Sequence, residues 1–132
     1  MMDTKLTVQQ MAAATGLSGD TLRYYEKIGL IDPVERAANG HRRYSQADVI
    51  WVEFLMRLRA TGMSIQQMQH YADLRRQGEA TVTERRQLLE AHYAEVEKHI
   101  REYEQLRTFI ADKIATYRQM EDTPHVRRKT AK

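Results

Sequence analysis

Residues 84–119 contain neither proline nor glycine, and apolar side chains recur there in alternating steps of three and four. This is the spacing of a heptad repeat on one long helix. Such a helix spans roughly 50 Å at ~1.5 Å per residue. A chain of 132 residues can build only a small core beside it. A second copy of the chain must therefore cover the apolar edge, which predicts a homodimer.

The edge is formed by the a and d positions of the repeat, although Arg86 and Arg107 interrupt the a series. The repeat leaves open whether the two helices run antiparallel or cross in another way. The predicted dimerisation residues are Val82, Leu89, Tyr93, Val96, Ile100, Tyr103, Ile110, Ile114 and Tyr117.

Two short helices are predicted before this rod. Thr7 and Gln10 match a capping box, so a helix should run over residues 8–14. Ser18 can cap a second helix, which Gly29 ends. Two short helices joined by a glycine turn form a helix-turn-helix pattern, which many unrelated proteins also contain.

A hairpin should follow. Asn39-Gly40 is the strongest two-residue hairpin signal, because both central residues of that turn take positive φ. The returning arm carries Arg42, Arg43 and Tyr44. Adjacent strand residues face opposite sides of a hairpin. Only one of the two arginines can therefore point directly into the groove of a bound nucleic acid, while both are long enough to reach its phosphates.

Three further helix starts are predicted from cap patterns at residues 45–48, 64–67 and 81–84. The first of these helices should bury one apolar stripe together with the residues beside it. These are Ile50, Phe54 and Leu58, flanked by Trp51 and Leu55.

A helix followed by a basic hairpin can hold duplex DNA from two sides. Arg23 and Tyr24 would lie on the DNA-facing side of the second helix, since arginine binds guanine edges or phosphates and tyrosine binds phosphates. The alternative is a solvated arginine beside two core tyrosines, and Tyr25 does have core spacing. The helix start at Ser64 is either a phosphate-binding site or an ordinary N-cap.

Several function classes are excluded or disfavoured. The absence of cysteine excludes disulfides, thiolate metal sites and thiol redox sensing. His92 and His99 have no third metal ligand nearby, and no phosphate loop or catalytic constellation is present, so neither a cofactor nor an enzyme is expected. Without a bilayer-length apolar run or a signal peptide, a soluble cytoplasmic protein is expected.

The motifs TLRYYEKIGL, NGHRRYS and LRATGMSIQQM together resemble the MerR family of bacterial transcription regulators. The resemblance covers residues 6–74 closely, and the long helix fits the family's dimerisation coiled coil. It implies a mainly α fold with a winged helix-turn-helix DNA-binding head at 1–78. An antiparallel coiled-coil helix would follow at 79–120, and then a flexible basic tail at 121–132.

The resemblance also implies a function. Family members bind a palindromic promoter operator as homodimers, and activators bend and untwist the DNA so that RNA polymerase can use a badly spaced promoter. The residues matching family DNA contacts are Ser18, Thr21, Arg23, Tyr24, Arg42, Arg43, Tyr44, Arg59 and Ser64.

The signal that such a regulator would sense stays open. The chain is most similar to a subgroup linked to aldehyde and electrophile stress, yet it lacks the cysteine which that group's thiol switch uses. A small-molecule effector near Trp51, Phe54, Tyr71 or Tyr93 is one alternative, although these aromatics can equally be core; ligand-free binding is another. A protein-interaction module built on the coiled coil is the alternative function class.

Overall fold

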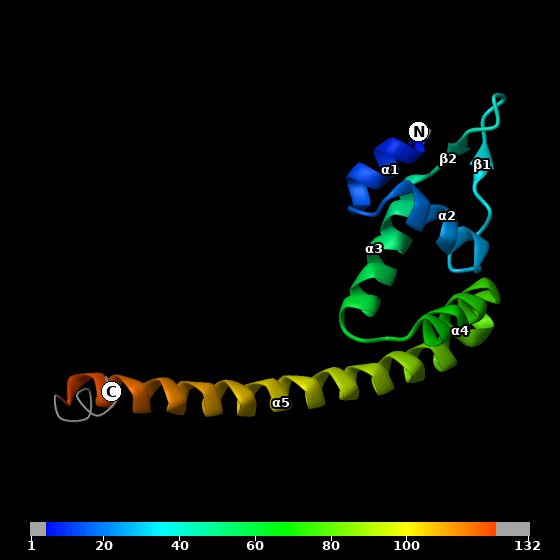
Figure 1. Ribbon diagram of the computed structural model, residues 1–132. Coiled ribbons are helices and arrows are strands. Elements are labelled where there is room, and N and C mark those ends of the chain that lie inside the picture. The colour runs from blue at the N-terminus through cyan, green and yellow to red at the C-terminus, as the bar shows by residue number, and fades with distance from the viewer. Residues whose placement is uncertain (1–4, 124–132) are drawn as a thin grey trace. The chain divides into compact units, whose positions relative to one another are not determined.

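The computed structural model describes residues 5–123 and is mainly helical, with a helical head and one long C-terminal helix (Figure 1). The expected fold class is confirmed. In chain order the elements are α1 (Val8–Thr15), α2 (Gly19–Lys27), β1 (Glu35–Arg36), β2 (Arg42–Arg43), α3 (Gln46–Ala60), α4 (Ile65–Arg76), the 3₁₀ turn η1 (Gly78–Thr81) and α5 (Val82–Asp122). Residues 121–122 were expected to belong to the tail but are the last two residues of α5. From residue 124 onward the expected tail lies outside the described residues.

Local capping chemistry sets most of the helix starts. Thr7, Ser45 and Ser64 each accept a hydrogen bond from the amide three residues on, and the side chain of that third residue accepts one from the cap residue's own amide. The expected box at Thr81 is wrong. Its hydroxyl instead donates to the carbonyls of Leu74 and Gly78, because η1 folds this residue back under the end of α4.

The hairpin is present, but its turn differs from the expected one. Among the described residues only glycines have positive φ, so Asn39 does not adopt the left-handed conformation that a two-residue turn needs. Within this turn only Gly40 has a positive φ, at 85°. Its amide donates to the Ala37 carbonyl, and the Asn39 side chain accepts from the His41 amide. The result is a three-residue loop that closes the β1–β2 ladder.

The head core is built from all four of its helices and the segment that joins α2 to β1. Trp51, Phe54 and Tyr71 pack together with ring centroids 5.5–6.0 Å apart. The expectation for Ile50 is wrong, because its side chain is 70% exposed. At about 100° per residue it points some 140° away from Leu55, which lies at the centre of the buried stripe of α3.

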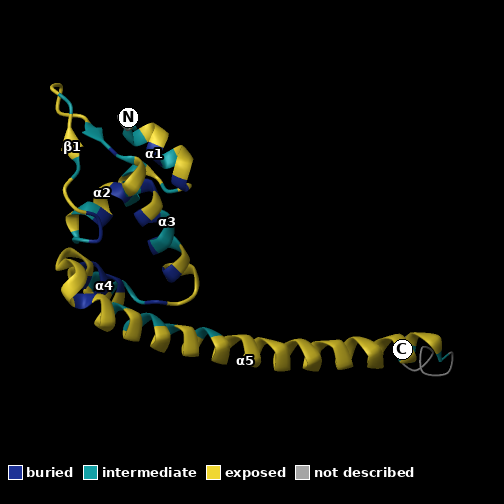
Figure 2. Cartoon of the chain, turned by 180° about the vertical axis from the view of Figure 1, so that it is seen from behind, coloured by how far each residue is buried: buried dark blue, intermediate teal, exposed yellow. Residues whose placement is uncertain are grey.

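Helix α5 contains no buried residue, as the exposed colouring along its length in Figure 2 shows. The chain divides into two compact units, residues 1–92 and 93–132, and the boundary falls inside this helix. Leu88 and Leu89 are half-buried against the head core, which explains why the first unit extends into α5. The domain limits after residues 78 and 120 stay predictions.

Candidate nucleic-acid interface

The start of α2 is organised by Ser18, which caps the helix. Its hydroxyl accepts from the Thr21 amide at 3.1 Å and donates to the Thr21 hydroxyl at 3.0 Å. Ser18 is exposed and Thr21 is half-buried. The two hydroxyls therefore lie together at the positive end of the helix dipole, where an anion is favoured.

The side chains at residues 23–25 divide between surface and core as periodicity predicts. Tyr25 is buried, which confirms its core spacing. Tyr24 is 51% exposed and Arg23 is also exposed. Arg23 pairs with Asp20, one turn earlier on the same exposed face. This surface pair is weak in water, so Arg23 can exchange Asp20 for another anion at low cost.

The two wing arginines differ in their surroundings. Arg42 donates through Nε to Oε1 of Glu26 on α2 at 2.7 Å, and both side chains are mostly shielded from water. Arg43 is the next strand residue and therefore faces the other side of the hairpin, where it lies opposite Glu35 in the ladder. The ion pair joins the wing to α2. Within residues 5–123 no hydrogen bond involves the Nη groups of Arg42, which can donate to another anion.

Tyr44 was expected to contact DNA, and this prediction is wrong. The residue is fully buried, and its hydroxyl has no hydrogen-bond partner among the described residues. Its backbone pairs with Leu6 through bonds of 2.7 and 2.8 Å, which turn the ring into the core. Burial raises the pKa of the Tyr44 phenol, although the positive charge of Arg42 partly offsets this.

Arg59 and Ser64 flank the turn between α3 and α4. Arg59 is exposed near the end of α3, and its Nη1 lies 3.5 Å from the Met63 carbonyl oxygen, at the limit for a hydrogen bond. Ser64 caps α4 through the amide of Gln67. No hydrogen bond within residues 5–123 joins Arg59 or Ser64 to α2 or the wing, so they form a separate candidate contact at a second helix start.

Sequence reasoning missed two groups that shape this surface. Glu26 anchors Arg42 across 16 residues of chain, and no local pattern signals such a pair. Arg36 is exposed on the wing and donates to the Gly40 carbonyl. The cluster of arginines between residues 36 and 44 was the available signal for it.

Some of the aromatic side chains considered for an effector site belong to the core of the head. Trp51 and Tyr71 are buried in the aromatic cluster of the head, whereas Tyr93 is exposed in the second unit. Over the described part of the chain, no three side chains of the metal-binding types gather. Within the same residues no helix has the length and apolarity to cross a membrane.

Known proteins are similar to this chain in sequence. The family described as "MerR HTH family regulatory protein" matches residues 6–74, and the one described as "MerR, DNA binding" matches residues 49–113. The HTH-type transcriptional regulator AdhR of Bacillus subtilis (strain 168) is 40% identical over 84 residues. That match covers 64% of this chain and 60% of AdhR, so the chain spans less than two thirds of this relative.

Solved structures agree with the sequence match. HiNmlR, a MerR family regulator lacking the sensor domain and bound to promoter DNA, superposes with a TM-score of 0.83 at 31% identity, covering 94% of this chain and 98% of HiNmlR. A MerR-type protein from Listeria monocytogenes has a TM-score of 0.82 at 32% identity, covering 96% and 92%. The chain therefore belongs to the MerR family of helix-turn-helix transcription regulators.

Proposed function

We propose that the chain binds a palindromic promoter operator as a homodimer and controls transcription initiation by distorting the DNA. The observation that carries this proposal is the joining of α2 to the basic hairpin by the Arg42–Glu26 ion pair, with Arg23 and Tyr24 exposed beside it. A helix for the major groove and a wing for the flanking backbone then move as one piece.

The proposed contacts are divided by role. Arg23 reads a base edge or grips a phosphate, the wing arginines bind the backbone, and the starts of α2 and α4 offer amides and hydroxyls to phosphates. The proposed DNA-binding residues are Ser18, Thr21, Arg23, Tyr24, Arg42, Arg43, Arg59 and Ser64.

The proposed dimer interface is the apolar edge of α5. Most of its predicted residues are exposed in the single chain, and only Leu89 and Val96 are half-buried. An isolated helix with such an edge is unfavourable in water, whereas a second copy buries it. Two heads on one coiled coil then match the twofold symmetry of a palindrome.

Regulation would follow from the energy of DNA deformation. A dimer that bends and untwists an overlong promoter spacer brings its two elements into a register that RNA polymerase recognises. RNA polymerase is thus the second proposed partner, and the cytoplasm is the proposed compartment. The proposed sign of regulation is activation.

Footprinting on the DNA upstream of the gene, combined with transcription in vitro, tests this proposal. We expect a protected inverted repeat between the promoter elements and increased transcript. Arg23→Ala should weaken binding by about 1–3 kcal/mol if Arg23 reads a base. If no upstream or selected duplex binds to the wild type even at low salt, the interaction-module alternative is favoured instead.

A further inference from the structure

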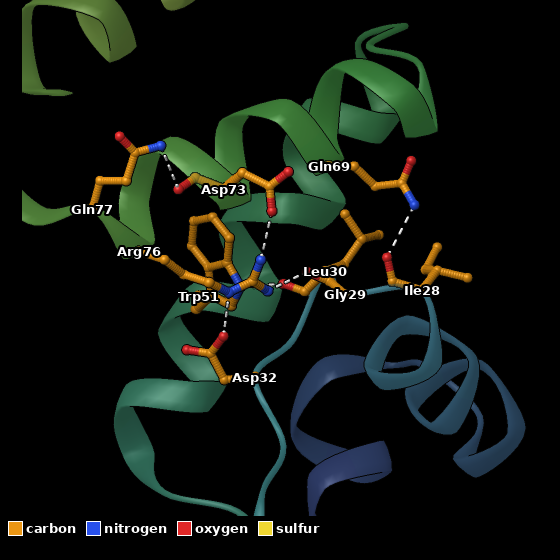
Figure 3. Close-up of polar contacts among 9 residues, drawn as sticks. All are labelled: Ile28, Gly29, Leu30, Asp32, Trp51, Gln69, Asp73, Arg76 and Gln77. Atoms are coloured by element: carbon orange, nitrogen blue, oxygen red, sulfur yellow. Dashed lines mark hydrogen bonds and ion pairs between the residues drawn. The ribbon is translucent and has the colours of Figure 1, made fainter.

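The loop that joins α2 to the wing is held from outside by three side chains. The carbonyls of residues 28–30 each accept a hydrogen bond from α3 or α4 (Figure 3). Gln69 donates through Nε2 to the first at 2.9 Å, and Trp51 donates through Nε1 to the third at 2.8 Å. Nη2 of Arg76 donates to the middle one. Three consecutive carbonyls are thus fixed to the rest of the head.

The amides of the same loop are bonded to α2. Gly29 takes φ 82° and donates to the Glu26 carbonyl at 3.2 Å, while Leu30 donates to the Tyr25 carbonyl at 2.9 Å. These two bonds form a Schellman motif, the common glycine ending of a helix. The loop is therefore a rigid link, because its donors hold the recognition helix and its acceptors hold α3 and α4.

Arg76 contacts this link at its middle carbonyl and again on the side of the wing. Besides the carbonyl of Gly29, its guanidinium contacts Asp32 through Nε and Asp73 through Nη1, the latter at 2.9 Å. Asp32 lies just before Pro33 and the start of the wing. The side chain is only 34% exposed, and each of its three nitrogens already has a protein acceptor. The guanidinium donors of Arg76 are therefore engaged by acceptors within the head.

We propose that Arg76 is a positioning residue that sets the angle between the recognition helix and the wing, and through that angle the spacing of their DNA contacts. This inference rests on the proposed function. A lysine could keep the charge, but its single ammonium group could not replace the three separate nitrogens through which Arg76 contacts its acceptors. Arg76 acts through the loop and not by touching phosphate.

The experiment compares Arg76→Lys and Arg76→Gln with the wild type and with Arg101→Gln. Arg101 is exposed on α5 at a position outside the a and d series, so its loss matches the change in net charge. Asp32→Asn is a fourth variant, which removes only the wing-side anion. Thermal unfolding first establishes that each variant is folded.

Hydrogen exchange in the free protein tests the positioning without DNA. In both Arg76 variants the amides of residues 31, 32 and 34–36 should exchange at least tenfold faster, while those of α1 and α3 stay protected as in the wild type. Unchanged exchange at 31–36 would overturn the proposal. If Arg76→Gln does not fold, Arg76→Lys and Asp32→Asn carry the same expectation.

Operator binding tests the consequence. We expect both Arg76 variants to bind about tenfold more weakly. Wing protection in the footprint should be lost and recognition-helix protection kept, and the dependence of log Kd on log salt should fall because the wing contacts to phosphate are lost. Wild-type binding by Arg76→Lys would overturn the proposal, as would wing protection that persists in the footprints of the Arg76 variants. Failure of the wild type itself to bind DNA contradicts the proposed function, and exchange at 31–36 then still decides the role of Arg76.

Discussion

Neighbouring residues of the wing have very different roles. Arg42 is held by Glu26 and mostly shielded, Arg43 faces the other side of the hairpin, and Tyr44 lies wholly inside the head. An alternation of this kind follows from the two-residue period of a strand. Which side becomes core depends on what packs there, and here Leu6 pairs with Tyr44.

Arg42→Gln and Arg43→Gln form a matched pair of variants. Each should weaken operator binding and lower the salt slope by about one, because each removes a proposed phosphate contact. Only Arg42→Gln should also lower the free energy of unfolding, by about 1–3 kcal/mol, since it leaves the shielded Glu26 carboxylate unpaired. Urea unfolding and salt-dependent titrations separate the two effects. Equal stability of the two variants would contradict the assigned role of Glu26.

Tyr44→Phe should leave the fold intact. The hydroxyl it removes is buried without a partner among the described residues, so the free energy of unfolding at pH 7 should stay the same or rise by up to ~1 kcal/mol. Urea unfolding measures this difference. Tyr24→Phe, at an exposed position of α2, is the control.

The same variant predicts a pH dependence. Burial raises the folded-state pKa of Tyr44 above its ordinary value of 10.0. The wild type therefore has this residue's full contribution to stability below pH 10 and loses it as pH rises from there toward the folded pKa. Tyr44→Phe should lose less stability than the wild type over that window. Parallel losses in the two proteins would show that the phenol is not held neutral.

At the scale of elements, the helices are defined by local chemistry and the hairpin by one glycine. Capping residues act on amides three positions away, so their effect does not depend on the rest of the fold. The wing is short, with two residues paired on each strand, and its shape depends on the turn. Gly40 supplies the only positive φ in that turn.

Gly40→Ala should therefore weaken the wing. A Cβ at φ 85° costs roughly 1–2 kcal/mol, although nothing within 4 Å would clash with it. Asn39→Ser is the control, because it keeps the net charge and its hydroxyl can still accept from the His41 amide. We expect Gly40→Ala to lower operator affinity more than Asn39→Ser, as measured by titration at fixed salt. Equal affinities would indicate that the turn conformation does not matter for binding.

At the scale of the whole molecule, the exposed edge of α5 demands a partner. Ile100, Tyr103 and Ile110 are exposed in the single chain at a or d positions. Leu106 and Phe109 are also exposed but lie outside that series, so the heptad pattern did not identify them. A dimer interface that uses α5 is therefore wider than two rows of the repeat if it also covers these residues.

Ile100→Glu should dissociate the dimer. A carboxylate buried in the seam costs about 3 kcal/mol or more, which corresponds to roughly a hundredfold weaker association. Thr108→Glu places the same charge on an exposed face of α5 outside the a and d series, and should leave the mass unchanged. Light scattering at micromolar concentration measures both. A wild-type mass equal to one chain would contradict the dimer itself.

The sequence by itself determined the helix starts, the long α5, the presence of a hairpin and most of the exposed candidate contacts. These depend on interactions within about four residues or on simple periodicity. It also excluded every role that needs a thiol, because the chain has no cysteine.

Only the tertiary structure decided which side chains are core and which residues hold the proposed DNA-binding parts in place. In the folded head Tyr44 is buried and Ile50 is exposed. Thr81 bonds to the end of α4 and does not form the expected cap, and Arg76 donates to Gly29 across 47 residues. Burial and long-range pairing depend on which distant segments meet. A local pattern does not contain that information, because the same side chain is stable on a surface or in a core according to what packs against it.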